Sequence, residues 1–275
     1  YKSLLYVKLG IWLMKNEAVV ENKYKKVIEF LNKALNDIKE KPKVWHYYAI
    51  ANYYLFNEKT ENENENIKIN LLKKSIESFA KAICLEFNSN GKYTIQDLLR
   101  FLDLWYEHHD SKNIEIRECL EKSVDIIRNK DWILIYGPIL ARVEQKESFT
   151  TSAKKILTNL ARDYPQILIF PLLVARRSNV TVRSKIASRI LLSLQETHQD
   201  LINDARLFAD ELIRVSVLFE EQWYHGFGEA IRYKHEGNMQ MVTYILNTLF
   251  NNTTKNINKP TINETAFFYH YGATL

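Results

Sequence analysis

Hydrophobic residues recur every three or four positions through most of the chain, and this spacing predicts amphipathic helices. The first predicted helix covers residues 3–15, with an apolar face made of Leu5, Leu9, Trp12 and Leu13. Further helices are predicted over residues 24–38, 42–56, 67–87, 94–108, 113–128, 181–195, 200–235 and 239–249, and a last one begins after Pro260. The pattern therefore predicts an all-α protein.

Proline and capping residues decide several helix boundaries. Residues 132–143 and 165–175 are dense apolar runs, but Pro138 and Pro171 lie inside them, and proline is excluded from central strands. Both runs are therefore predicted to be helices with kinks. Thr94, followed by Asp97 three residues later, matches a variant of the capping box and predicts a helix start at residue 94.

Helix pairs joined by short turns recur at intervals of roughly 35 to 45 residues, which is typical of TPR-like or HEAT-like solenoids. No position recurs with a fixed residue type, so an irregular helical bundle is the alternative architecture. Residues 57–66 alternate asparagine with acidic residues and contain no apolar residue, which predicts a variable surface loop.

Composition agrees with a folded helical chain. Hydrophobic residues make up 46% and charged residues 26%, as in ordinary globular proteins, and the 7 glycines and 5 prolines are few for a β-rich or Rossmann-type fold. The 38 basic and 33 acidic residues are spread along the chain without forming a basic stripe, so nucleic-acid binding is not expected. No apolar stretch approaches the roughly 20 residues that cross a bilayer, so no membrane span is expected.

The sequence offers no motif for catalysis. It has no glycine-rich phosphate loop, no kinase metal-ligand motif and no nucleophile elbow, so no catalytic, cofactor-binding or metal-ligating residue is expected in this segment. The adjacent His108, His109 and Asp110 point to different faces of a helix and do not make a metal site. Cys84 and Cys119 lie on apolar helical stretches without CxxC spacing and are expected to be structural thiols.

The stretch at residues 211–231 belongs to the long helix predicted over residues 200–235. Its apolar residues lie on two sides, the first with Leu212, Val215, Phe219, Trp223 and Ala230 and the second with Ile213, Val217, Tyr224 and Ile231. Phe227, Ile231 and His235 form a further stripe at four-residue spacing. A helix that is apolar on two sides packs on both sides or offers a groove to a partner.

Several stretches in collinear order resemble the FAT and FRB regions of the target-of-rapamycin (TOR) kinase family. They are VKLG at residues 7–10, KVWHYYAIANY at 43–53, DLLRFLDLWYEH at 97–108, ILARVE at 139–144, YPQILIFPLLVA at 164–175, ELIRV at 211–215 and ETAFFYHYG at 264–272. The loop at residues 57–66 falls where this family carries a variable insertion. The resemblance implies FAT-like helical repeats over residues 1–205 and the N-terminal part of the four-helix FRB bundle over residues 206–275.

The resemblance also implies a function. The parent would be a Ser/Thr protein kinase of the phosphatidylinositol 3-kinase-related class in nutrient and growth signalling, with ATP and magnesium bound in its kinase domain. This segment would clamp the kinase domain, dock protein substrates over the catalytic cleft and contact TOR-complex subunits. The implied location is cytoplasmic, with endomembrane association through the parent complex. The alternatives are a stand-alone TPR-like adaptor and a non-TOR member of the same kinase class.

Individual residues are carried over from the family by position. Its rapamycin groove uses a leucine, a serine and a phenylalanine at the positions of Phe227, Ile231 and His235, so all three differ here. A β-branched side chain at residue 231 fills space that the drug needs, and binding of an immunophilin–rapamycin complex is therefore expected to be poor. The structural core of the bundle is expected to include Phe219, Trp223 and Gly226. The remaining groove residues are expected on the fourth helix, beyond residue 275.

Overall fold

The computed structural model describes residues 1–16, 21–58, 65–86, 93–143, 147–178, 180–216, 218–254 and 259–274. Every regular element within these ranges is a helix, so the predicted all-α class is confirmed. The chain divides into two compact units, which we call unit 1 (Tyr1–His198) and unit 2 (Gln199–Leu275).

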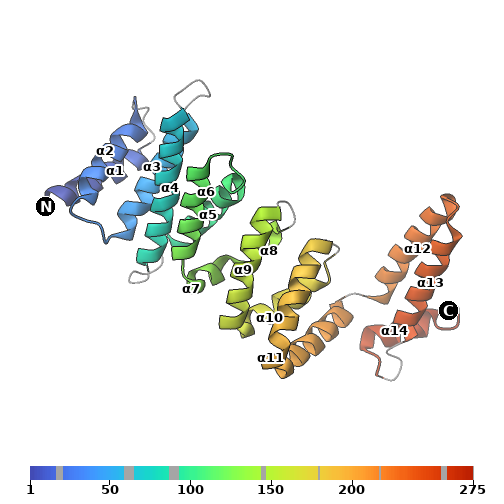
Figure 1. Cartoon of the computed structure of the whole chain (residues 1–275). Coiled ribbons are helices and arrows are strands. Elements are labelled where there is room, and N and C mark those ends of the chain that lie inside the picture. The colour runs from blue at the N-terminus through green and yellow to red at the C-terminus, as the bar shows by residue number, and fades with distance from the viewer. Residues whose placement is uncertain are drawn as a thin grey trace. The chain divides into compact units, whose positions relative to one another are not determined.

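The first half of unit 1 is built from stacked helices, as the periodicity predicted. They are α1 (Lys2–Lys15), α2 (Lys23–Leu35), α3 (Pro42–Glu58), α4 (Glu65–Leu85), α5 (Thr94–His108) and α6 (Ile114–Ile126). Neighbours along the chain pack together: α1 with α2, α2 with α3, α3 with α4, and α4 with both α5 and α6 (Figure 1). This arrangement is a helical-repeat solenoid in which each pair buries the apolar face of the next.

The second half of unit 1 departs from the prediction in two places. Its elements are α7 (Asn129–Trp132), the 3₁₀ turn η2 (Ile133–Ile135), α8 (Tyr136–Arg142), α9 (Glu147–Asp163), α10 (Pro165–Arg176) and the first part of α11 (Thr181–Ser216). The single kinked helix predicted over residues 132–143 is instead three short elements. Pro138 lies in the first turn of α8, where its missing N–H removes no helical hydrogen bond. The helix α9 was not predicted from the sequence.

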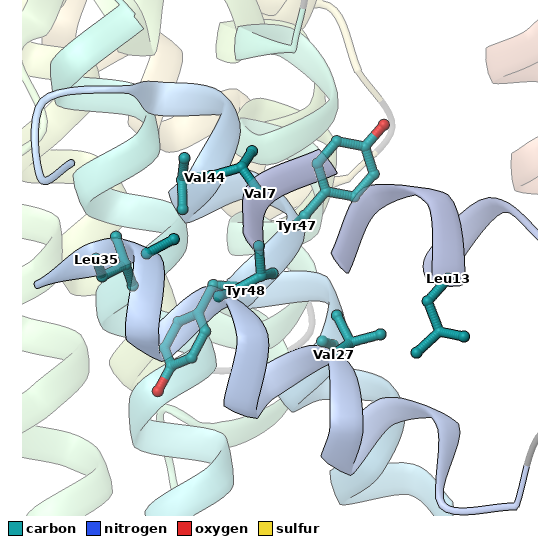
Figure 2. Packing of buried hydrophobic residues seen from close by; sticks show 10 residues of the cluster. Val7, Leu13, Val27, Leu35, Val44, Tyr47 and Tyr48 are labelled. Atoms are coloured by element: carbon teal, nitrogen blue, oxygen red, sulfur yellow. The ribbon is translucent and has the colours of Figure 1, made fainter. Parts of the chain in front are cut away.

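The core of the N-terminal helices joins α1, α2 and α3. Figure 2 shows its buried side chains, which include Val7, Leu13, Val27, Leu35, Val44, Tyr47 and Tyr48. The predicted face of α1 is wrong in part, because Leu5, Leu9 and Trp12 are 56%, 38% and 63% exposed. Gly10 lies on the side of α1 that is buried instead, and a Cβ there would stand 2.9 Å from Leu31 Cδ2, so the glycine lets α2 approach closely.

A buried polar pair joins α3 to α5. His46 Nδ1 lies 2.6 Å from Asp97 Oδ1, and the two side chains are 5% and 0% exposed. Burial raises the pKa of the Asp97 carboxyl, and the neighbouring His46 opposes this shift. The Asp97 side chain therefore pairs with His46 and not with the start of α5. The Thr94 hydroxyl also bonds elsewhere, since its Oγ1 donates to Glu86 Oε2 at 2.9 Å. The capping box predicted from Thr94 and Asp97 is not formed.

Both ends of the loop predicted over residues 57–66 belong to helices. The helix α3 continues through Asn57 to Glu58, and α4 begins at Glu65. The rest of that stretch lies outside the described residues, as does residue 144 of the quoted ILARVE motif.

Unit 2 contains the second part of α11, followed by α12 (Phe219–His235), α13 (Met239–Thr254) and α14 (Ile262–Tyr271). The prediction of one helix over residues 200–235 is wrong. The backbone leaves helical geometry at His198 (φ −138°, ψ 37°), and the extended Leu218 (φ −69°, ψ 146°) precedes a new helix. The apolar residues of the predicted two-sided helix are therefore divided between α11 and α12, and residue 217 lies outside the described part of the chain.

Candidate protein-docking groove on α12 and α14

The helices α12 and α13 pack closely at a glycine. A Cβ on Gly226 would stand 2.5 Å from Cδ1 of Leu249, which is far inside normal contact distance. Gly228, on the same helix, has open space at its Cβ position. The first of these glycines is therefore required for the close approach of α13, and the second is not.

Trp223 anchors this helix pair and forms part of an aromatic cluster. Its Nε1 donates to Thr253 Oγ1 at 3.0 Å, and Thr253 Oγ1 in turn donates to the Leu249 carbonyl at 2.8 Å. The Trp223 ring centroid lies 4.9 Å from that of Phe250 and 5.2 Å from that of Phe227. Because Trp223 is 5% exposed and hydrogen-bonded, its ring position is set by α13.

The helix α14 brings a second set of aromatic rings to α12. Phe219 and Phe267 lie 5.3 Å apart between ring centroids, and Phe267 and Tyr271 lie 5.2 Å apart. Between the helices lies a groove of about 310 Å³, which we call the aromatic groove; it is lined by Glu220, Trp223, Phe227, Phe267, Tyr271 and Thr274. Of the six described residues in this lining, four are aromatic, so the surface that they form is mainly apolar.

An ion pair holds α14 in place within unit 2. Arg214, on α11, donates from Nε to Glu264 Oε1 at 2.7 Å and from a terminal nitrogen to Oε2 at 2.5 Å, so the pair is bidentate. Glu264 also closes a capping box, accepting from the Thr261 N–H at 2.7 Å while its own N–H donates to Thr261 Oγ1 at 3.2 Å. Hydrogen bonding to Arg214 lowers the pKa of the Glu264 carboxyl, although desolvation opposes the shift.

The six predicted site residues all lie on α12. Phe227 lines the aromatic groove and is 48% exposed, whereas Ile231 (55% exposed) and His235 (exposed) lie further along α12, outside its lining. Phe219, Trp223 and Gly226 are buried between the helices of unit 2. The assignment of all six to a rapamycin groove and an FRB core stays a prediction.

The groove residues on α14 were not predicted from the sequence. The opposite wall was expected on a helix beyond residue 275, but Phe267 and Tyr271 already supply a wall here. Their four-residue spacing within the helix was the available signal, since residues four apart lie on one helix face.

The aromatic groove can bind an apolar surface, but its side chains suit no obvious reaction. Glu220 is the one charged residue among the described residues that line it. Among the residues that the structure describes, no group of three or more His, Cys, Asp or Glu could hold a metal ion. His109 Nε2 instead lies 3.1 Å from its neighbour Asp110 Oδ1.

The two thiols lie in unit 1, away from this groove in the sequence. Cys84 is half-buried and Cys119 is buried, and both are free. Burial raises the pKa of the Cys84 thiol, and burial together with Glu77 raises that of Cys119 to about 11. Both thiols are therefore protonated at neutral pH, which makes them poor nucleophiles.

Among the described helices, none combines the length and the apolar character that a membrane-spanning helix needs.

Two family models match consecutive parts of the chain. Residues 115–209 match the HEAT repeats of the ATR-like Ser/Thr protein kinases, and residues 211–275 match the FKBP12-rapamycin binding domain. The predicted domain boundary at residues 205 and 206 differs from this junction and from the division of the compact units after His198. That boundary stays a prediction.

Curated relatives match most of the chain. It is 27% identical to the Ser/Thr protein kinase TOR of Oryza sativa subsp. japonica over 90% of its length, and 30% identical to the Ser/Thr protein kinase mTor of Drosophila melanogaster over 66%. It is 26% identical to the Ser/Thr protein kinase tor1 of Schizosaccharomyces pombe over 85%. The chain spans only 10%, 7% and 10% of these three relatives.

The two family matches cover different helices of the chain. The part that matches the FKBP12-rapamycin binding domain contains α12, α13 and α14 with the aromatic groove, and the HEAT match runs from α6 into α11. The chain is homologous to TOR Ser/Thr protein kinases, and it fits the region of those kinases where the FAT helical repeats run into the FRB domain.

Proposed function

We propose that this chain is the scaffold and substrate-gating segment of a TOR-like Ser/Thr protein kinase in nutrient and growth signalling. Unit 1 would clamp the kinase domain, and unit 2 would dock protein substrates over its cleft and contact TOR-complex subunits. ATP and magnesium would bind in the kinase domain of the parent. The observation that carries the proposal is the aromatic groove, which lies within the part that matches the FRB domain.

The groove favours an amphipathic substrate segment. Phe227 and Tyr271 are each 48% exposed at its walls, and Glu220 adds one negative charge. An amphipathic helix places its apolar side chains in a groove of this kind, and docking raises the local concentration of the phosphorylation site near the cleft. Docking would therefore lower the KM of the substrate and leave the chemical step unchanged.

The test uses the intact parent kinase and two phosphoacceptor peptides, one with an appended amphipathic helix and one without it. The double substitution Phe227→Ala and Tyr271→Ala should raise the KM of the extended peptide about tenfold, because two apolar contacts are lost. The KM of the short peptide and both kcat values should stay unchanged.

A matched control separates docking from general damage. Tyr224 and Tyr269 are 78% and 86% exposed and lie outside the groove lining, so Tyr224→Ala with Tyr269→Ala should leave both KM values unchanged. Equal KM values for the groove variant and the wild type would refute substrate docking. A parent polypeptide without a kinase domain would favour the stand-alone adaptor instead.

The same proposal includes poor binding of an immunophilin–rapamycin complex. Ile231 is 55% exposed, so its branched side chain takes up space outside the protein core, where a ligand would lie. In the intact parent, Ile231→Ser should strengthen ternary binding at least tenfold in a titration by calorimetry. Tight binding by the unchanged protein would contradict this part.

The proposed location is the cytoplasm, with endomembrane association through the parent complex. Fractionation of cells that express the tagged parent checks it: recovery in the nuclear fraction alone would contradict this location.

A further inference from the structure

A second groove lies in unit 1, between α6 and α9, and the proposed function does not use it. Its volume is about 410 Å³, and we call it the inter-repeat groove. One wall is a stripe of α6 with Glu121, Val124 and Asp125, and the other is a stripe of α9 with Ser152, Lys155, Ile156 and Asn159. Spacings of three and four residues place each set on one helix face.

Two tryptophans line the bottom of the inter-repeat groove. Trp105 and Trp132 are 3% and 1% exposed, and their ring centroids lie 5.8 Å apart. Within the described part of the chain, neither indole N–H donates a hydrogen bond to the protein. Each N–H can therefore donate to an oxygen acceptor of an occupant.

The charges on the two walls are separate. Glu121 and Asp125 are exposed and lie one helical turn apart on α6, whereas Lys155 is exposed on α9. Within the residues described here, none of the three forms an ion pair with a protein side chain. The α6 wall therefore offers two carboxylates to a cation, and Lys155 offers donors to a carbonyl or carboxylate oxygen.

From these features we infer that the inter-repeat groove binds an extended basic peptide segment of a partner protein. An Arg or Lys side chain of the segment lies against Glu121 and Asp125. Its backbone carbonyl oxygens accept hydrogen bonds from the two indoles and from Lys155. Its aliphatic side chains contact Val124 and Ile156. The inference concerns unit 1 alone and does not depend on the aromatic groove.

The experiment uses the full chain, immobilised, and a random decapeptide display library as the probe. Selected peptides should be enriched in Arg or Lys beside an aliphatic residue. The best of them, as a free peptide, should change the fluorescence of the chain on binding, and its Kd should weaken as salt rises. Failure to enrich any peptide, or enrichment of acidic peptides, would overturn the inference.

Charge variants then locate the binding site. Glu121→Gln with Asp125→Gln should weaken the Kd about tenfold, since each exposed carboxylate contributes modestly. The matched control is Glu118→Gln with Glu29→Gln, which removes two exposed carboxylates outside the groove and should leave the Kd unchanged. Equal losses in both variants would indicate a general charge effect and refute a specific site.

A steric variant gives an independent reading. Ser152 is exposed on the α9 wall, so Ser152→Trp should fill the groove and weaken binding at least tenfold without changing the circular dichroism melting curve. Arg162→Trp, on the same helix but outside the lining, is the control and should bind as the wild type does. Unchanged binding by the Ser152→Trp protein would show that the peptide lies elsewhere.

Discussion

Glu264 connects the pH of the solution to the stability of unit 2. Its side chain is 4% exposed and receives hydrogen bonds from Arg214 and from the Thr261 N–H. These contacts favour the ionised carboxylate and lower its pKa below the ordinary 4.5. A carboxyl group whose pKa is lower in the folded state than in the unfolded state stabilises the fold. This stabilisation is fully present above the unfolded-state pKa and is lost as the pH falls through the folded-state pKa.

We therefore expect unit 2 to lose stability selectively below about pH 4.5. The chain labelled with 5-fluorotryptophan allows the measurement, because the ¹⁹F resonance of Trp223 reports on unit 2 during urea unfolding. Glu264→Gln should lower the stability of unit 2 at pH 7 by about 1 to 3 kcal/mol, since a charged hydrogen-bond acceptor is lost.

The difference between Glu264→Gln and the wild type should shrink as the pH falls below 4.5, because the wild-type carboxyl is then protonated as well. Glu236→Gln is the control, because Glu236 is exposed and makes only a long ion pair, with its Oε1 3.9 Å from Arg232 Nε. A difference that stays constant from pH 7 to pH 3 would rule out the ionised carboxylate as the source of the stability.

At the residue scale, groove residues on a single helix were easier to predict from the sequence than the residues that face them from another helix. Phe227 was singled out by its four-residue stripe and does line the aromatic groove, but Ile231 and His235 on the same stripe do not. Phe267 and Tyr271 were not identified, because a spacing pattern does not show which distant helix will face α12. The capping box predicted from Thr94 and Asp97 was wrong for a similar reason. Asp97 pairs with His46, 51 residues away, and local spacing does not reveal such a distant partner.

At the scale of elements, the contact between α12 and α13 depends on one glycine of a nearby pair. Gly226→Ala should destabilise unit 2 by about 1 to 3 kcal/mol, because the new Cβ would overlap Leu249 and force it to move. Gly228→Ala should be neutral or stabilise by up to about 1 kcal/mol, because its Cβ meets open space and alanine favours the helix. Urea unfolding followed at Trp223 measures both.

The Leu249→Ala background distinguishes overlap from other effects of the substitution. With the leucine shortened, Gly226→Ala should cost less than it does in the wild type, because the two positions are coupled by direct contact. An equal cost in both backgrounds would show that the overlap is not the cause.

Helix existence was easier to predict than helix ends or buried faces. Strong periodicity located α2 to α6 within a few residues of their observed bounds. The break at Leu218 was missed because the apolar spacing continues across it, so periodicity alone gives no sign of a change in backbone direction. The face of α1 was misjudged because the helix is apolar on several sides, and only packing against α2 decides which side is buried.

For the whole molecule, the all-α class and the repeat architecture followed from the sequence, but the division after His198 did not. The apolar pattern runs across it, whereas each compact unit contains a hydrophobic cluster of its own, in unit 1 one that joins α1, α2 and α3 and in unit 2 one built on Phe219, Trp223, Leu249 and Phe267. Separate cores favour separate unfolding transitions, since cooperativity follows shared packing.

Urea unfolding of the full fluorotryptophan-labelled chain should therefore show two transitions. The resonances of Trp105 and Trp132, which contact each other in unit 1, should change together, and that of Trp223 should change at a different urea concentration. Gly226→Ala should shift only the Trp223 transition, because its clash lies within unit 2. A single transition, shifted as a whole by that substitution, would mean that the two units fold as one cooperative body.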